Sequence, residues 1–134
     1  MGMGEAMMIA GIGCRRRVST QAVVLAIRTA CAGADLDIGR LSALASGEIR
    51  AGEPALIAAA DALGVPLMIV AQQELLQVAA GVQTQSAVSA RIAGVPSLSE
   101  AAALAAVGPG ARLTVPRQIC GDVTCAIAIS GEPS

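Results

Sequence analysis

The segment from Met8 to Arg17, MIAGIGCRRR, constrains the fold more than any other part of the chain. The apolar run Met7 to Ala10, which overlaps the beginning of this segment, is typical of a buried strand that is followed at once by turn residues. We expect Gly11 and Gly13 to form a tight loop in which the backbone can approach a ligand closely. Ser19 then predicts the start of a helix. A strand, a glycine loop and a helix start together present free backbone N–H groups to an anion.

The three consecutive arginines of this segment allow two interpretations. They precede the positive end of the predicted helix, where each cation is disfavoured by roughly 0.3–1 kcal/mol. In the first interpretation they are a solvated loop, because neighbouring guanidinium groups repel only weakly in water. In the second, Arg15 and Arg16 bind a negatively charged ligand together with Gly11, Gly13 and Cys14. An anion would turn an unfavourable placement into a favourable one.

Composition excludes several function classes. The chain has 134 residues, which predicts one domain over residues 1–134 with residues 1–6 as a loose extension. It contains no Phe, Tyr or Trp, so Ala, Val, Ile and Leu must build the core. The net charge of −1 gives no positive field that would attract nucleic acid. Because the chain has no aromatic side chains on which nucleotide bases could stack, we expect no nucleic-acid binding. The absence of histidine excludes His-based triads and His metal ligands.

The cysteines and the hydropathy indicate a protein of the cytoplasm. The four cysteines form no C-x-x-C pair, and we expect free thiols and no bound metal or other cofactor; they are Cys14, Cys31, Cys120 and Cys125. Mean hydropathy is +0.68, but glycine, proline, glutamine and arginine interrupt every apolar stretch before it reaches about 18 residues. We therefore expect no membrane segment, and the N-terminal residues do not resemble a signal peptide.

Helical and strand periodicities alternate along the chain. The helical patterns are expected at residues 19–33, 54–64, 73–79, 86–92 and 97–107, with a polar break at 81–85. The later strands are expected at residues 65–70, 112–116 and 123–130, the last two as a hairpin. Leu41 to Ala45 fits a strand, but a helical turn that begins at Asp37 fits nearly as well. The predicted fold class is α/β, with one three-layer α/β/α domain around a mostly parallel, mixed sheet of about four to five strands. We expect the apolar run Val65 to Val70 to be a strand of this sheet that is covered on both faces.

Other motifs carry weaker signals. Glu53 precedes Pro54 and suits either a helix terminus or a site. Ser97 and Glu100 form a capping box, which explains both residues without a ligand. A dinucleotide fingerprint is weak because Arg16 stands where its third glycine should be, and Asp35 or Asp37 is a poor match for its acidic residue. A phosphate-binding P-loop is excluded because the chain has no lysine. Cys14 could act as a nucleophile, but no base lies beside it in the sequence.

Four motifs between Met8 and Ser130 carry a resemblance to a known family. They are GIGCRRR, RAGEPALIAAADALGVPLMIV, GVPSLSEAAALAA and VPRQICGDVTCAIAIS. In this order they resemble the C-terminal domain family of the cobalamin-biosynthesis protein CbiG, which also occurs free-standing as CobE. The resemblance implies a cytoplasmic protein of corrin-ring synthesis. It also implies a relation to multidomain hydrolases that open a lactone on a cobalt-containing precursor and release acetaldehyde, although this chain resembles the free-standing form.

The sequence departs from this family at three arginines. The family commonly has glycine where this chain has Arg17, and a left-handed backbone would be costly there. The family often has lysine at Arg50 and Arg117, so a lysine-dependent proton transfer would be lost whereas carboxylate binding would be kept. Arg15, Arg16, Arg50 and Arg117 could then hold the acetate and propionate groups of a corrin precursor, aided by helix starts at Ser19, Glu53 and Ser97.

The leading hypothesis is therefore a cobalamin-biosynthesis protein that binds or processes a carboxylate-rich precorrin or corrinoid intermediate. The candidate ligand-binding residues are Gly11, Gly13, Cys14, Arg15, Arg16, Arg50, Glu53, Ser97, Glu100 and Arg117. No residue is assigned to catalysis, and both an enzyme and a carrier remain open. The alternatives are a non-catalytic partner or carrier module for other enzymes of the pathway and, less favoured, a nucleotide-binding domain. A homodimer is compatible with the sequence.

Overall fold

A computed structural model of the chain describes residues 7–85, 98–108 and 110–130. One sheet runs in the order β3-β2-β1-β5-β4, with β1 at Met8–Cys14, β2 at Ala43–Gly47, β3 at Leu67–Val70, β4 at Arg112–Cys120 and β5 at Val123–Ile129. The helices of the described part are α1 (Thr20–Gly33), α2 (Pro54–Leu63), α3 (Gln72–Gln85) and α5 (Leu98–Val107), with 3-10 turns η1 (Ile38–Arg40) and η2 (Glu48–Arg50).

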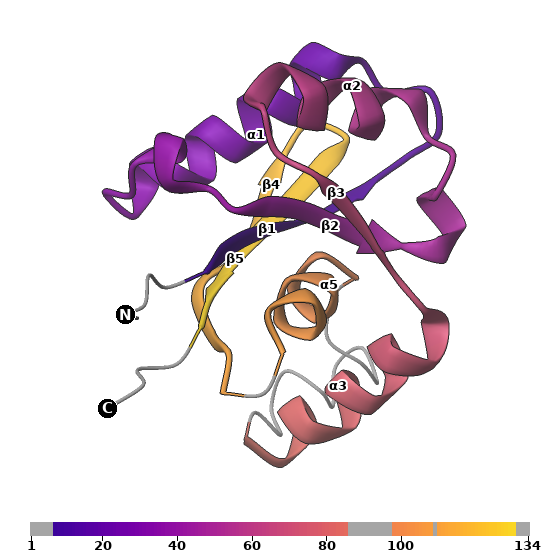
Figure 1. The fold of residues 1–134 in the computed structure, drawn as a ribbon, viewed down its shortest axis with the longest axis vertical. Coiled ribbons are helices and arrows are strands. Elements are labelled where there is room, and N and C mark those ends of the chain that lie inside the picture. The colour runs from indigo at the N-terminus through magenta and orange to yellow at the C-terminus, as the bar shows by residue number, and fades with distance from the viewer. Residues whose placement is uncertain (1–6, 86–97, 109, 131–134) are drawn as a thin grey trace.

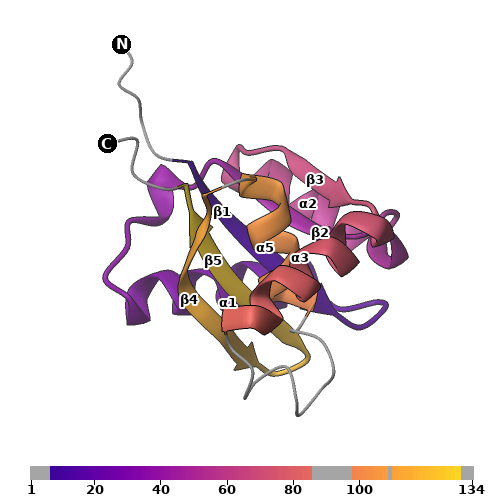
Figure 2. The same cartoon turned by 90° about the horizontal axis from the view of Figure 1, so that it is seen from below.

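The sheet is mixed and lies between two layers of helices. β1, β2 and β3 pair in parallel, whereas β5 is antiparallel to both β1 and β4, so four of the five strands run in one direction. Figure 1 shows α1 and α2 over one face of the sheet and α3 and α5 over the other. Figure 2 shows that α5 lies along the sheet and that α3 lies beside it. The predicted three-layer α/β/α architecture and strand number are confirmed.

The predicted glycine loop is wrong, because β1 continues through it. Gly11 pairs with Ala126 of β5 and Gly13 pairs with Thr124, and Ile12 between them is fully buried. A Cβ atom at Gly11 would overlap the carbonyl oxygen of Ser99 and lie 2.7 Å from the amide nitrogen of Ala103, both in α5. The glycines therefore allow a close approach of protein backbone rather than a turn.

Local signals at the helix ends are confirmed. The Ser19 hydroxyl oxygen accepts a hydrogen bond from the Ala22 N–H at 3.0 Å, as expected of an N-cap. Pro54 occupies the first turn of α2, and Gly64 ends that helix in the left-handed conformation with φ 73°. Both alternatives for residues 37–46 occur in succession, since η1 begins after Asp37 and β2 follows it. The C-terminal hairpin also forms, with β4 longer than expected.

Two other expectations need correction. β3 is not fully covered on both faces, because Met68 and Ile69 are 36% and 37% exposed; it lies at the edge of the sheet. The apolar sequence of a strand does not reveal whether another strand pairs with its outer edge. α3 runs through the predicted polar break at residues 81–85. The predicted helix at 86–92 and the residue Ser97 lie outside the described residues.

Replacing Gly11 by Ala tests the close contact between α5 and β1. Because the added methyl group has no space, we expect the free energy of unfolding to fall by about 1–3 kcal/mol or more. Gly33→Ala is a matched control: a Cβ atom there would meet nothing within 4 Å, and the residue lies at the end of α1. The control should keep its stability or gain up to about 1 kcal/mol. Urea denaturation of both variants measures the difference, and equal midpoints would contradict the packing described.

Candidate functional site

The described helices all begin at one edge of the sheet, which we call the carboxyl edge. α1, α2 and α3 each follow the carboxyl end of β1, β2 or β3. α5 begins there too, because Leu98 lies against Gly47 at the end of β2, with a Leu98 methyl group 3.0 Å from the position that a Cβ atom would take. Helix N-termini carry partial positive charge. Four of them at one edge favour an anionic ligand.

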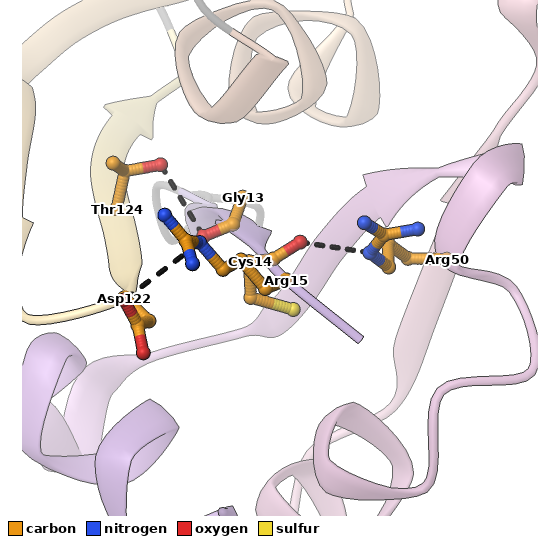
Figure 3. Close-up of polar contacts among 6 residues, drawn as sticks. All are labelled: Gly13, Cys14, Arg15, Arg50, Asp122 and Thr124. Atoms are coloured by element: carbon orange, nitrogen blue, oxygen red, sulfur yellow. Dashed lines mark hydrogen bonds and ion pairs between the residues drawn. The ribbon is translucent and has the colours of Figure 1, made fainter. Parts of the chain in front are cut away.

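The arginine loop, residues 14–17, connects β1 to α1 at the carboxyl edge. Arg15 forms a long ion pair with Asp122 in the β4–β5 turn, with 3.8 Å between Nε and Oδ1 and with side chains 80% and 64% exposed. So exposed a pair contributes little to stability. Figure 3 shows Asp122 and Thr124 on one side of the end of β1 and Arg50 on the other. The Thr124 hydroxyl donates to the Gly13 carbonyl oxygen at 3.3 Å, which fixes the hairpin beside the loop.

Arg50 joins the loop after β2 to the loop after β1. Its Nε donates to the Cys14 carbonyl oxygen at 2.7 Å, and its Nη1 donates to the Ile49 carbonyl oxygen at 3.2 Å. The side chain is half-buried. Arg50 therefore positions the first residue of the arginine loop, a role that its place in the sequence did not reveal.

Glu53 holds the other end of the arginine loop. The residue is 8% exposed, and its carboxylate accepts the Arg17 N–H at 3.2 Å instead of capping its own helix α2. Arg17 has φ 63°, so the left-handed conformation that we expected to be costly for arginine is present. For residues other than glycine it costs roughly 1–2 kcal/mol. The hydrogen bond that the Arg17 N–H donates to the Glu53 carboxylate offsets this strain.

A surface pocket of about 710 Å³ opens between the beginnings of α1 and α2. Its walls include Arg16, Arg17, Arg50 and Glu53, together with the exposed aliphatic side chain of Ile49. The structure thus brings two candidate arginines, Arg16 and Arg50, to one cavity with Glu53. Cys14 lies beside this group because Arg50 bonds to its carbonyl oxygen.

The remaining candidate residues lie outside this pocket. Glu100, in the first turn of α5, accepts the Arg117 N–H of β4 at 3.0 Å. This contact occurs where the pairing of β4 with β5 is irregular, between Val115 and Gln118. Gly11 and Gly13 contact α5 and Thr124, so neighbouring protein atoms fill the space that we expected a ligand to approach.

The carboxylates of the carboxyl edge bind backbone N–H groups. Glu48, which the sequence analysis did not single out, accepts the Gln72 N–H at the start of α3 at 3.1 Å. Glu53 and Glu100 accept N–H groups of Arg17 and Arg117 in the same way. Within residues 7–85, 98–108 and 110–130, Arg16, Arg17 and Arg50 form no ion pair. Their guanidinium groups are therefore not directly paired with the described carboxylates.

Comparison with known proteins identifies the family. Residues 8–128 match the family model described as "Cobalamin synthesis G C-terminus". The chain belongs to this family. The family is one of cobalamin-biosynthesis proteins, as the resemblance of the four motifs implied.

Individual members of the family are similar over most of their length. The chain is 32% identical to "Protein CobE" of Sinorhizobium sp over 121 residues, which are 90% of this chain and 79% of that protein. The crystal structure of cobalamin biosynthesis protein chiG from Agrobacterium tumefaciens is 44% identical with a TM-score of 0.80, covering 94% of this chain and 100% of that one. A crystal structure of CobE is 30% identical with a TM-score of 0.77, covering 92% and 90%.

The cysteines of this family member are free in the structure. Burial raises the pKa of the Cys14 thiol, the Glu53 carboxylate raises it further, and Arg50 opposes both effects by its charge and a hydrogen bond. Burial likewise raises the pKa of Cys125 to about 12. A raised pKa lowers the thiolate fraction at neutral pH, so Cys14 is poorly suited to nucleophilic chemistry.

In the described residues no three His, Cys, Asp or Glu side chains gather as a metal site would require. None of the helices in this part of the chain has the length and apolar character needed to cross a bilayer.

Alkylation of a Cys120→Ser variant tests the environment of Cys14, because Cys31 and Cys125 are buried. At pH 8 we expect iodoacetamide to react with Cys14 more slowly in the folded protein than in the same chain unfolded in urea. Adding Glu53→Gln removes a negative charge and should lower the pKa of Cys14 and speed the reaction. A folded-state rate at or above the unfolded rate would show that the thiol is activated after all.

Proposed function

We propose that the carboxyl edge binds the carboxylate rim of a corrin-ring intermediate of cobalamin biosynthesis. The observation that carries the proposal is the pocket between α1 and α2, where Arg16, Arg17 and Arg50 meet and form no ion pair with the described acidic residues. Membership of a cobalamin-biosynthesis family makes a corrin precursor the relevant anion.

The charge distribution supports a carboxylate ligand. Four of the nine arginines belong to the two loops that end β1 and β2, although the whole chain has a net charge of −1. Guanidinium groups bind carboxylates through two parallel hydrogen bonds, an arrangement that a point charge cannot reproduce. The positive ends of α1 and α2 border the same pocket and add to its attraction for anions.

The pocket is suited to one side of a large ring. Its volume of about 710 Å³ lies within the usual range for small-molecule sites, roughly 300–1,000 Å³. Ile49 borders it and is 73% exposed, which offers an aliphatic surface for a flat apolar ring in a chain without aromatic residues. We infer that ring carboxylates meet the arginines while the ring face rests on Ile49.

Binding is favoured over covalent catalysis at this pocket. Of the described side chains nearby, the Cys14 thiol has a raised pKa and the Glu53 carboxylate is engaged with a backbone N–H. Neither is presented as a free nucleophile. The arrangement is suited to holding an intermediate, and the proposal accordingly concerns binding.

The double substitution Arg15→Ala, Arg16→Ala tests the proposal. Both side chains are exposed, so the free energy of unfolding should change by no more than about ±0.5 kcal/mol. Affinity for cobyrinic acid, a stable corrin with free carboxylates, should fall by about 1.5–3 kcal/mol for each charge-assisted hydrogen bond that the substitutions remove. Titration followed in the visible absorption band of the corrin measures the affinity.

The matched control is Arg40→Ala, Arg112→Ala, which removes the same charge from the opposite edge of the sheet, where β2 and β4 begin. It should keep its affinity. Cobinamide, whose peripheral carboxylates are replaced by amides, should bind the parent weakly, and added salt should weaken binding of cobyrinic acid. Equal affinity of the parent and the Arg15/Arg16 variant at equal salt would refute the arginine site.

A further inference from the structure

We propose that Glu53 is a positioning residue of the corrin site: its carboxylate holds the arginine loop in the conformation that directs the arginines toward a ligand. The inference rests on the proposed function, because it assigns a role within the same site. It is motivated by a buried carboxylate whose bond partner is 36 residues away in the sequence.

The arginine loop is held at both ends by one short segment, residues 50–53. At its beginning, Arg50 Nε donates to the Cys14 carbonyl oxygen at 2.7 Å. At its end, the Glu53 carboxylate accepts the Arg17 N–H at 3.2 Å. Arg15 and Arg16 lie between these two contacts. The segment thus fixes the two ends of the loop and leaves the two central side chains exposed to solvent.

The segment that holds the loop is itself held by backbone hydrogen bonds. The Glu53 N–H donates to the Arg50 carbonyl oxygen at 3.0 Å, and the Glu53 carbonyl oxygen accepts the Leu56 N–H of α2 at 3.1 Å. Glu53 is therefore anchored by backbone bonds on both sides, and its side chain is not needed to cap α2. Its carboxylate is available for Arg17, whose left-handed conformation needs support from its surroundings.

If Glu53 acted only through its charge, its removal would have the opposite effect on ligand affinity. Glu53 places a negative charge in the wall of a pocket that would bind anions. If that charge were its main effect, removing it would tighten the binding of a carboxylate ligand. If Glu53 instead positions the loop, its removal weakens binding, because a disordered loop must be ordered each time a ligand binds.

The first arm of the test needs no ligand. Glu53→Ala should lower the hydrogen-exchange protection of the Arg17 amide by about tenfold or more, since the amide loses its acceptor. Glu53→Gln keeps an acceptor oxygen and should retain most of the protection. Glu48→Ala is the matched control: Glu48 bonds to the Gln72 N–H at α3, so the Arg17 amide should be unaffected. Unchanged protection of Arg17 in Glu53→Ala would overturn the proposal.

The second arm measures binding of cobyrinic acid. Glu53→Ala should bind about tenfold more weakly than the parent, whereas Glu53→Gln should bind as tightly or more tightly because it loses the repulsive charge but keeps the acceptor. Arg17→Gly supplies a rescue: glycine adopts a positive φ without strain. In that background the weakening caused by Glu53→Ala should shrink to less than about threefold.

The outcomes separate this inference from the proposed function. If Glu53→Ala binds as tightly as the parent or more tightly, while the Arg15/Arg16 variant loses binding, the arginine site stands and the positioning role is wrong. If the parent binds no cobyrinic acid, the proposed function fails and the inference fails with it. Weak binding by both Glu53→Ala and Glu53→Gln would also overturn the inference, because the amide should replace the carboxylate as acceptor.

Discussion

The close contact between α5 and β1 at Gly11 is the constraint on which the arrangement of the whole molecule depends. A chain without aromatic residues fills its core with small side chains, so its layers must approach closely for dispersion forces to be effective. α5 meets this need with three buried alanines, Ala101 to Ala103, of which Ala103 lies against Gly11, where β1 has no Cβ atom. The position of α5 then brings its first turn, and with it Glu100, to the carboxyl edge.

The carboxyl edge divides its charges between two tasks. Glu48, Glu53 and Glu100 accept backbone N–H groups from segments that are distant in sequence, and these bonds join the loops and helices around the edge. The arginines of the first two loops keep exposed or half-exposed guanidinium groups. Acidic residues thus join the segments of the edge, while the arginines leave positive charge exposed on its surface. This division places exposed positive charge at one edge of a chain whose net charge is −1.

Features set by neighbouring residues were predictable from the sequence, whereas those set by distant ones were not. Ser19, Pro54 and Gly64 act within their own helices, and local chemistry predicted each of them. Gly11 was assigned to a loop because glycine permits both a turn and a close approach, and only the position of α5 decides between them. The arginine loop could be proposed from MIAGIGCRRR, but the contact of Glu53 with Arg17 joins two segments that the sequence does not relate.

The balance of energies at Arg17 shows how this chain accommodates a left-handed residue other than glycine. A left-handed arginine costs roughly 1–2 kcal/mol. A hydrogen bond from its N–H to a carboxylate contributes about 1.5–3 kcal/mol, so the buried Glu53 is sufficient to offset the strain. The chain thereby gains a third guanidinium group at the pocket wall with little net loss of stability. Glycine at this position would remove both the strain and the positive charge.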